Sequence, residues 1–387
     1  MSTRQKLTAA QRWPHLFGYS GVERITGNLW GMNPGGGRFY MAGRIWIPTT
    51  TKLDLLKAAG VTHVEAHDTD VLDLVLGEKG ALGYPKGMSE AEKMRLAREA
   101  ARKLKEECEK RGLKVGMWTM NLFNSDVLFI FGNLGSENDK TRELAIQRTI
   151  VGMEIAQELG CIYVFWNGTN GPDGPFAANY IVRYERTYQA IVQILRTMHR
   201  RYGDKTQPMA AENKGEEPKL RMLNPVSQSF TSLALRLALE HPVLAGLLGD
   251  NIEFGHEEMM QLDPAMSFAE ALFHGVLLHT HFNDQNGKPG FDADLGAGIT
   301  SFTKLVDSLL QLRHGKYTGL IGIDAQPTPT DSDDQQSETI ALSVLYLRAG
   351  LTKADELDTD ELRALRARHD QAGINRYIAR NLVGIAA

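Results

Sequence analysis

The 387-residue chain contains only two cysteines, Cys108 and Cys161, and no apolar run long enough to cross a bilayer. Cys108 falls in a charged, helical stretch and Cys161 at the start of an apolar one. We therefore expect no structural disulfide, and a reducing compartment is favoured. The first residues, MSTRQKLTAAQRW, lack the apolar core of a secretory signal. The sequence predicts a cytoplasmic protein with no membrane partner.

An excess of positive charge is also missing. Lys and Arg number 43 against 47 Asp and Glu, for a formal net charge of −4. The electrostatic footprint of nucleic-acid binding is therefore absent, and we expect no nucleic-acid partner. The sequence contains no repeat beyond its strand–helix alternation and no low-complexity segment. No GxGxxG turn follows the first predicted strand, which weakens the alternative of an open, dinucleotide-binding sheet.

Short apolar, β-rich runs alternate with longer helical patterns along most of the chain. The eight predicted strands cover residues 26–32, 62–66, 113–120, 161–166, 207–212, 247–253, 277–282 and 319–325. This alternation is typical of an α/β protein with a parallel sheet, and eight such units predict a (β/α)8 TIM barrel. We expect the catalytic barrel domain to span residues 1–350. The charged tail, residues 351–387, is predicted to be a helical arm that packs on another subunit.

Seven of these strands end in, or are closely followed by, a residue whose side chain can bind a ligand or take part in catalysis. These residues are His67, Phe123, Trp166, Glu212, Glu253, His281 and Asp324. Because the carboxyl ends of barrel strands meet at one mouth, these side chains are expected to share a site. Two closely spaced pairs, Glu253 with His256 and Asp292 with Asp294, can each face one ion. A capping histidine and a turn-forming aspartate pair are the alternatives. Mixed oxygen and nitrogen ligands suit Mg²⁺, Mn²⁺ or Co²⁺.

Several motifs, taken in chain order, resemble the xylose (glucose) isomerase family. They are HDTD at 67–70, NLF at 121–123, FW at 165–166, ENKGEEP at 212–218, NIEFGHEEM at 251–259 and DAD at 292–294. Members of that family are (β/α)8 barrels, usually homotetramers, that use two divalent metal ions to interconvert an aldose and a ketose. The resemblance therefore implies a sugar isomerase in which ring opening precedes a metal-assisted 1,2-hydride shift.

The resemblance also implies a role for each matching residue. The first, structural ion would be held by Glu212, Glu253, His281 and Asp324. The second, catalytic ion would be held by Glu253, His256, Asp292 and Asp294, with Glu253 bridging both. Lys214 would hydrogen-bond substrate oxygens near the reacting carbons, and His67, oriented by Asp70, would assist ring opening. The substrate pocket would be lined by Trp166, Phe123 and, from a neighbouring subunit, Phe39. Strand-end aromatics also occur simply as core residues.

Three departures from the family pattern leave the sugar open. Position 281 is His where xylose isomerases have Asp, and this histidine resembles the rhamnose isomerases. Replacing an oxygen ligand by imidazole should favour Mn²⁺ or Co²⁺ over Mg²⁺. WNGTNG at 166–171 replaces WGGREG, and ENKGEEP replaces EPKPNEP. The metal chemistry is retained, so isomerisation of another aldose, such as rhamnose, is an alternative.

Three other functions occur on related barrels. Ketose 3-epimerases typically use one metal with two glutamates as acid and base, whereas this chain carries a second ligand set, His256, Asp292 and Asp294. A DNA-repair endonuclease needs a histidine-rich trinuclear zinc site and a basic groove. A sugar-binding barrel has no reason to retain Lys214 and both ligand sets. The sequence therefore favours the aldose–ketose isomerase, with the 3-epimerase as the alternative.

Overall fold

The structure is a computed structural model, and it describes residues 8–33, 46–123, 129, 131–166, 168, 174–216, 228–327, 331–332 and 335–385. The strands are β1 (Thr26–Asn28), β2 (His63–His67), β3 (Lys114–Thr119), β4 (Ile162–Trp166), β5 (Met209–Glu212), β6 (Leu248–Glu253), β7 (Leu277–Phe282) and β8 (Gly322–Ile323). The helices are α1 (Ala9–Arg12), α2 (Thr49–Ala59), α3 (Asp73–Leu76), α4 (Glu90–Lys110), α6 (Asp139–Leu159), α7 (Tyr180–Tyr202), α8 (Gln228–Glu240), α9 (Phe254–Met259), α10 (Pro264–His274), α11 (Phe302–His314), α12 (Glu338–Leu357), α13 (Asp360–Ala367) and α14 (Gln371–Ile378).

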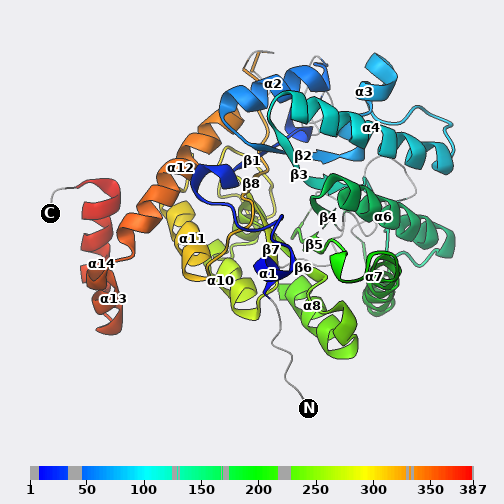
Figure 1. Ribbon diagram of the computed structural model, residues 1–387. Coiled ribbons are helices and arrows are strands. Elements are labelled where there is room, and N and C mark those ends of the chain that lie inside the picture. Colours follow the sequence, from blue (N-terminus) through cyan, green and yellow to red (C-terminus); the bar gives the residue numbers. More distant parts are fainter. Residues whose placement is uncertain are drawn as a thin grey trace.

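The strands form one parallel sheet in chain order, β1 to β8, with helices on its outside (Figure 1). A parallel bridge between Ile25 and Ile321 brings the first strand against the last. The Thr26 amide donates to the Ile321 carbonyl at 3.0 Å across this seam. The predicted TIM barrel is confirmed. The first and last strands are shorter than expected. The first is cut short by a 3-10 helix at Trp30–Met32, and β8 has only two residues.

Local sequence signals explain where the outer helices begin and end. At the start of α4, Ser89 and Glu92 form a capping box, in which each side chain accepts from the other residue's backbone amide. Gly60 and Gly160 end α2 and α6 in the left-handed conformation, with φ values of 89° and 72°. A side chain is disfavoured in that conformation, so glycine at these two positions stops the helix.

Strand β2 separates apolar side chains outside the barrel wall from polar side chains inside it. In β2, Val64 and Ala66 are fully buried within the main hydrophobic core. The alternating residue Glu65 points the other way, since it contacts His279 and His281 of β7 across the barrel. Side chains alternate sides along a strand, so the same pattern aims the last residues of β5 to β8 at the mouth.

The C-terminal helices α13 and α14 (red in Figure 1) stand to one side of the barrel. Leu362, Leu365 and Tyr377 pack with Leu357 of α12 and Val306 of α11 in a small apolar cluster of their own. Helix α12 continues without a break through residue 350, the expected domain boundary. The packing of this arm on another subunit stays a prediction.

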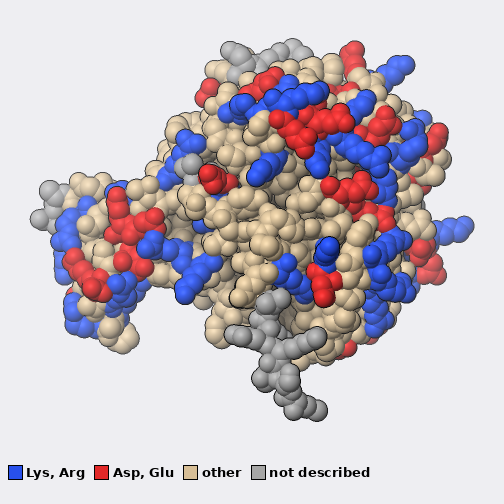
Figure 2. Space-filling model, in the orientation of Figure 1, with Lys and Arg blue, Asp and Glu red and all other residues tan. Residues whose placement is uncertain are grey.

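Three further observations concern surface charge, helix hydropathy and the cysteines. On the face shown in Figure 2, basic and acidic side chains are interspersed over the barrel and the C-terminal helices. Within the described residues, no helix combines the length and apolar character that crossing a membrane requires. Cys108 and Cys161 are both buried and free.

Candidate metal centre and active site

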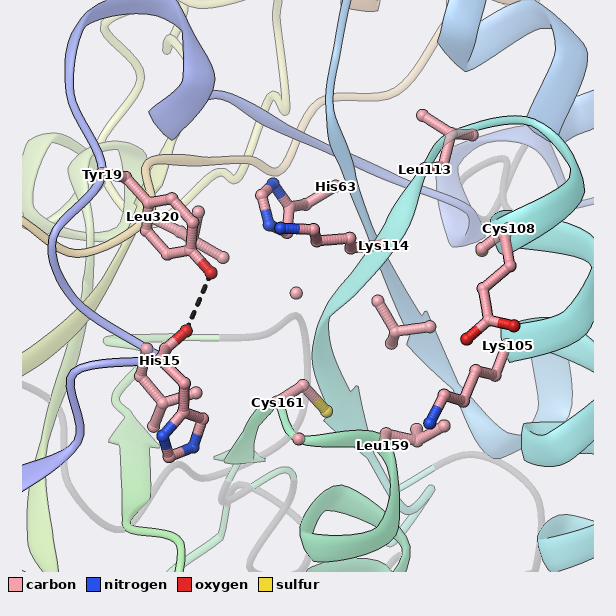
Figure 3. A pocket seen from close by; sticks show the side chains of 15 residues that line it. His15, Tyr19, His63, Lys105, Cys108, Leu113, Lys114, Leu159, Cys161 and Leu320 are labelled. Carbon is pink, nitrogen blue, oxygen red and sulfur yellow. Dashed lines mark hydrogen bonds between the residues drawn. The ribbon is translucent and has the colours of Figure 1, made fainter.

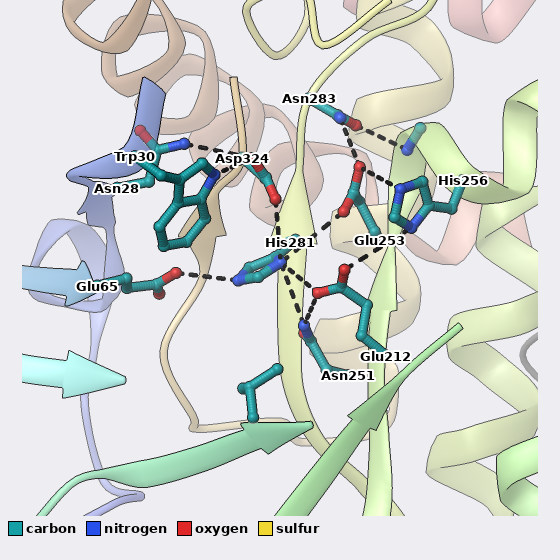
Figure 4. A network of polar contacts seen from close by, with 12 residues as sticks. Asn28, Trp30, Glu65, Glu212, Asn251, Glu253, His256, His281, Asn283 and Asp324 are labelled. Carbon is teal, nitrogen blue, oxygen red and sulfur yellow. Dashed lines mark hydrogen bonds and ion pairs between the residues drawn. The ribbon is translucent and has the colours of Figure 1, made fainter. Parts of the chain in front are cut away.

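Four successive strands, β5 to β8, deliver four polar side chains to the barrel mouth. They are Glu212, Glu253, His281 and Asp324, and we call them the first cluster (Figure 4). One ligand atom from each residue lies within 4.8 Å of the others. His281 Nδ1 is the shared centre: it lies 2.8 Å from a Glu212 oxygen, 3.8 Å from an Asp324 oxygen and 3.9 Å from a Glu253 oxygen. The residues proposed for the first ion therefore meet at one point.

The first cluster concentrates negative charge away from water. Burial raises the pKa of Glu253 well above its ordinary value, and the charges of Asp324, Glu212 and Asp292 add to this increase. Burial likewise raises the pKa of Asp324. Burial would raise the pKa of Glu212 too, but the His281 charge and hydrogen bond lower it overall. Glu253 Oε2 is buried and has no hydrogen-bond donor. An orphaned carboxylate oxygen among like charges fits a cation at this place.

A second cluster, Glu253, His256 and Asp292, shares Glu253 with the first. His256 Nε2 lies 3.3 Å from a Glu253 oxygen and 3.7 Å from an Asp292 oxygen. Its other nitrogen, Nδ1, lies 2.8 Å from the Asn213 carbonyl, which can only accept a hydrogen bond. Nδ1 therefore carries a hydrogen, and in the neutral ring Nε2 would offer its lone pair to an ion among the carboxylates. This is the form in which imidazole binds a metal ion.

Asp294 lies beside the second cluster without joining it. Its backbone adopts a φ of 42°, an uncommon conformation for a residue other than glycine. Its oxygens face the side-chain amides of Gln326, at 3.0 Å, and Asn283, at 3.4 Å. Asp294 is therefore held by donors from two neighbouring segments, and its role as a fourth ligand stays a prediction.

Lys214 links the second cluster to an aromatic wall. Its ammonium lies 2.7 Å from an Asp292 oxygen and 5.6 Å from the centre of the Trp166 ring. Burial would raise the pKa of Asp292, but the positive charge of Lys214 holds it well below its ordinary value. Trp166 packs edge-on against Phe123, with ring centres 4.2 Å apart, and Phe123 packs against His67 at 5.5 Å. Trp166, Phe123 and His67 therefore form one continuous surface.

His67 and Asp70 interact as expected from the HDTD motif. The imidazole Nδ1 lies 3.1 Å from an Asp70 oxygen, and the same oxygen accepts the His67 backbone amide at 2.7 Å. Burial would lower the pKa of His67, but the charge and hydrogen bond of Asp70 raise it. The other expected pocket residue, Phe39, lies outside the described residues.

Several residues of this region are missing from the sequence prediction. Trp30 Nε1 donates to Asp324 at 2.7 Å, and the Trp30 ring lies 4.6 Å from the His67 ring, so it extends the aromatic wall. Asn283 donates to Glu253 at 2.6 Å. Glu65 binds His279 and His281 from inside the barrel. The sequence did indicate a role for Glu65, because a glutamate in the middle of an apolar strand needs a buried partner.

A separate cavity of about 250 Å³ lies at the opposite end of the barrel (Figure 3). It is lined by residues at the starts of strands, including His63, Lys114 and Cys161. Burial raises the pKa of the Cys108 thiol, which also lines it, to about 12. Burial also raises the pKa of the Cys161 thiol, so both thiols are protonated and poorly nucleophilic. The polar clusters described above lie at the other end, where the strands finish, so this cavity is distinct from the candidate active site.

The fold and the clusters define a TIM barrel whose polar site is built from the carboxyl ends of its strands. A family model described as a xylose isomerase-like TIM barrel matches residues 53–349. The chain therefore belongs to the xylose isomerase-like TIM-barrel family. This confirms the superfamily inferred from the sequence motifs, but it does not distinguish xylose isomerases from their relatives.

Three solved structures with a similar architecture are two sugar epimerases and an epimerase-like protein by name. The apo 3-keto-D-glucoside 4-epimerase from E. coli has a TM-score of 0.55 and 12% identity, covering 83% of this chain and 98% of that one. A D-tagatose 3-epimerase-like protein has a TM-score of 0.55 and 16% identity, and the match covers 84% of this chain and 98% of that one. An L-ribulose 3-epimerase has a TM-score of 0.54 and 11% identity, and the match covers 87% of this chain and 98% of that one. At these identities the likeness shows the fold alone.

Proposed function

We propose that the protein is a metal-dependent sugar isomerase that interconverts an aldose and a ketose. The observation that carries this proposal is the pair of buried clusters that share Glu253. Their ligand atoms are a mixture of carboxylate oxygens and imidazole nitrogens suited to two divalent ions. Lys214 and the aromatic wall adjoin the second cluster. A small sugar would then contact the second ion, the ammonium and the wall together.

The residues that would hold the ions differ between the clusters. The first ion would be held by Glu212, Glu253, His281 and Asp324, and the second by Glu253, His256 and Asp292, with Asp294 as a further ligand. When bound, such ions act as Lewis acids that polarise adjacent sugar oxygens. Mn²⁺ or Co²⁺ is favoured over Mg²⁺ at the first site, because His281 supplies nitrogen where an oxygen would suit Mg²⁺ better.

The chain's own side chains would perform three tasks. His67, held by Asp70, would move a proton at the ring oxygen or anomeric hydroxyl as the sugar opens. Lys214 would donate to the oxygen on which negative charge develops. Trp166 and Phe123 would exclude water from the reacting carbons, so that hydrogen moves from C2 to C1 without exchange.

A ketose 3-epimerase is the second candidate, and the structural neighbours favour it. Two of the three bear the name of a 3-epimerase or of a protein like one. The first cluster alone would supply a one-metal site, leaving other carboxylates to move protons. This reaction removes a proton from C3 and returns one to its opposite face, so the product is another ketose and solvent hydrogen enters at C3.

A sugar panel distinguishes the two functions. Metal-stripped protein is supplied with Mg²⁺, Mn²⁺ or Co²⁺ and incubated with xylose, glucose, rhamnose, ribose or lyxose, and separately with their ketoses. Products are identified by NMR. Aldose–ketose interconversion supports the proposal. Ketose converted only to its C3 epimer replaces it with the second candidate, and no conversion of any sugar would reject both.

We also propose that the active unit is a homo-oligomer, most simply the tetramer that the sequence resemblance implies. The C-terminal arm, with its separate apolar cluster, supports this proposal. Phe39 would then complete the pocket of a neighbouring subunit.

A further inference from the structure

Glu65 is a buried charge that the proposed reaction does not use. It lies in the middle of β2, is fully buried and points into the barrel. One oxygen lies 3.0 Å from His279 Nε2 and the other 2.9 Å from His281 Nε2. The Thr26 hydroxyl also donates to the first oxygen. In Figure 4 the His281 ring lies between Glu65 and two other members of the first cluster, Glu212 and Glu253.

These contacts determine which nitrogen of His281 carries hydrogen. A carboxylate accepts hydrogen bonds and donates none, so the nitrogen facing Glu65 must be the donor. With Nε2 held as a donor by Glu65, Nδ1 is the nitrogen that would give up its hydrogen to bind an ion; without an ion it faces a carboxylate and carries a hydrogen as well. Nδ1 is the atom that lies 2.8 Å from Glu212 and 3.8 Å from Asp324. The ring is thus oriented, and its metal-facing nitrogen selected, from the side opposite the cluster.

We propose that Glu65 is a positioning residue for the first metal site, which fixes His281 as an Nδ1 ligand and raises its basicity. The inference rests on the proposed function. It also accounts for the residue at 281: an imidazole brings no negative charge to the cluster, and Glu65 supplies one through the ring. A hydrogen-bonded carboxylate behind a ligating histidine acts in this way in other metal sites. Glu65 and His281 should therefore behave as a unit.

The trio of Glu65, His279 and His281 could alternatively hold an ion itself, since its ligand atoms also lie within 4.8 Å of one another. We assign it to hydrogen bonding because both nitrogen–oxygen distances, 2.9 and 3.0 Å, are those of direct hydrogen bonds. Counting bound ions tests this assignment. An additional ion that is lost in Glu65→Gln would overturn the positioning role.

Metal affinity gives the first test. Glu65→Gln keeps the shape of the side chain but presents an NH₂ group to one imidazole. Stripped wild-type and variant proteins are titrated with Mn²⁺ against a competing chelator, and the Co²⁺ forms are compared by visible absorption. We expect Glu65→Gln to weaken the first site by about 10–100-fold and to change its Co²⁺ spectrum. Asp250→Asn, a buried carboxyl that instead faces Thr231, should leave both unchanged.

A double-mutant cycle separates action through His281 from a general structural effect. In a His281→Asp background, Glu65 would face another carboxylate, so Glu65→Gln should strengthen metal binding instead of weakening it. An equal loss of affinity in both backgrounds would show that Glu65 does not act through His281.

Nitrogen NMR tests the hydrogen-bond arrangement without metal or activity. With ¹⁵N-labelled histidine and His281→Asp for assignment, we expect hydrogen on His281 Nε2. A bare Nε2 would overturn the inference even if Glu65→Gln fails to fold. Failure of the proposed function looks different: wild-type protein would bind metal with the predicted Glu65 dependence but convert no sugar.

Discussion

Replacing Glu253 by Gln should change stability in opposite directions with and without metal. Its carboxylate belongs to both clusters, and its neighbours include Glu212, Asp324 and Asp292. Without metal, burial raises the pKa of Glu253, and these like charges raise it further. Such a group stabilises the fold below its ordinary pKa, and this contribution is lost as pH rises towards the folded-state pKa. Near neutral pH, removing the charge should therefore stabilise the metal-free protein.

The size of this effect follows from the geometry. Each like charge at 4.8 Å costs about 3.5 kcal/mol at an effective dielectric constant of ~20, and His281 at 3.9 Å returns about 4 kcal/mol. Three repulsions therefore leave a net penalty of about 6 kcal/mol for an ionised Glu253. Protonation limits this penalty, because keeping an ordinary Glu side chain neutral at pH 7 costs only about 3.7 kcal/mol. Allowing for the imperfect fit of the amide, we expect about 1–3 kcal/mol, or roughly 1–4 °C in Tm for a chain of this length.

The assay is thermal unfolding of metal-stripped and Mn²⁺-saturated protein between pH 5 and 8. Wild type should gain about 2.7 kcal/mol when the free ion is at ~100 times its Kd, and Glu253→Gln should lose most of this gain together with its catalytic activity. Asp250→Asn is the matched control, since burial also raises the pKa of Asp250 outside the clusters. A Glu253→Gln protein that retains two tightly bound ions, or is less stable than wild type without metal, would refute the reasoning.

Four further predictions concern the pocket and the assembly. Lys214→Met should keep its metal content, measured by elemental analysis, but lose about 10²–10³-fold in kcat, because the ammonium acts on substrate oxygen; a rate like that of wild type contradicts this role. Asp70→Asn should lower the pKa of His67, since Asp70 raises it, and so move the acidic limb of the kcat/KM profile to lower pH; an unmoved limb argues against His67 as the proton carrier. His281→Asp should shift the preference from Mn²⁺ or Co²⁺ towards Mg²⁺, which activity with each ion tests; an unchanged preference would mean that position 281 is not a ligand. Light scattering at assay concentration should show an oligomer, and a fully active monomer would end the proposed role of Phe39.

The barrel was predictable because each strand–helix unit carries its own signals. Alternating apolar runs mark the strands, and Gly60 and Gly160 end helices where their left-handed backbone requires. Residues at strand ends were predictable as a group for a similar reason: parallel strands in chain order bring Glu212, Glu253 and His281 together whatever the loops do.

Contacts across the barrel were harder to predict. Glu65 meets His281 although they are 216 positions apart, and only closure of the sheet brings β2 near β7. Asp294 illustrates the limit in loops. Its spacing from Asp292 could not reveal its positive φ or the side-chain amides from other segments that hold it. Loop geometry depends on partners that spacing along the sequence does not reveal.

The fate of a single hydrogen tests the central claim most directly. An aldose that the Mn²⁺-loaded protein accepts is labelled with deuterium at C2, and the ketose formed in ordinary water is examined by NMR. Transfer within the sugar breaks the C2–deuterium bond and forms a C1–deuterium bond, so the proposed isomerase should place the label at C1 of the ketose. Loss of the label to water, or product epimerised at C3 with no aldose–ketose conversion, would contradict the account.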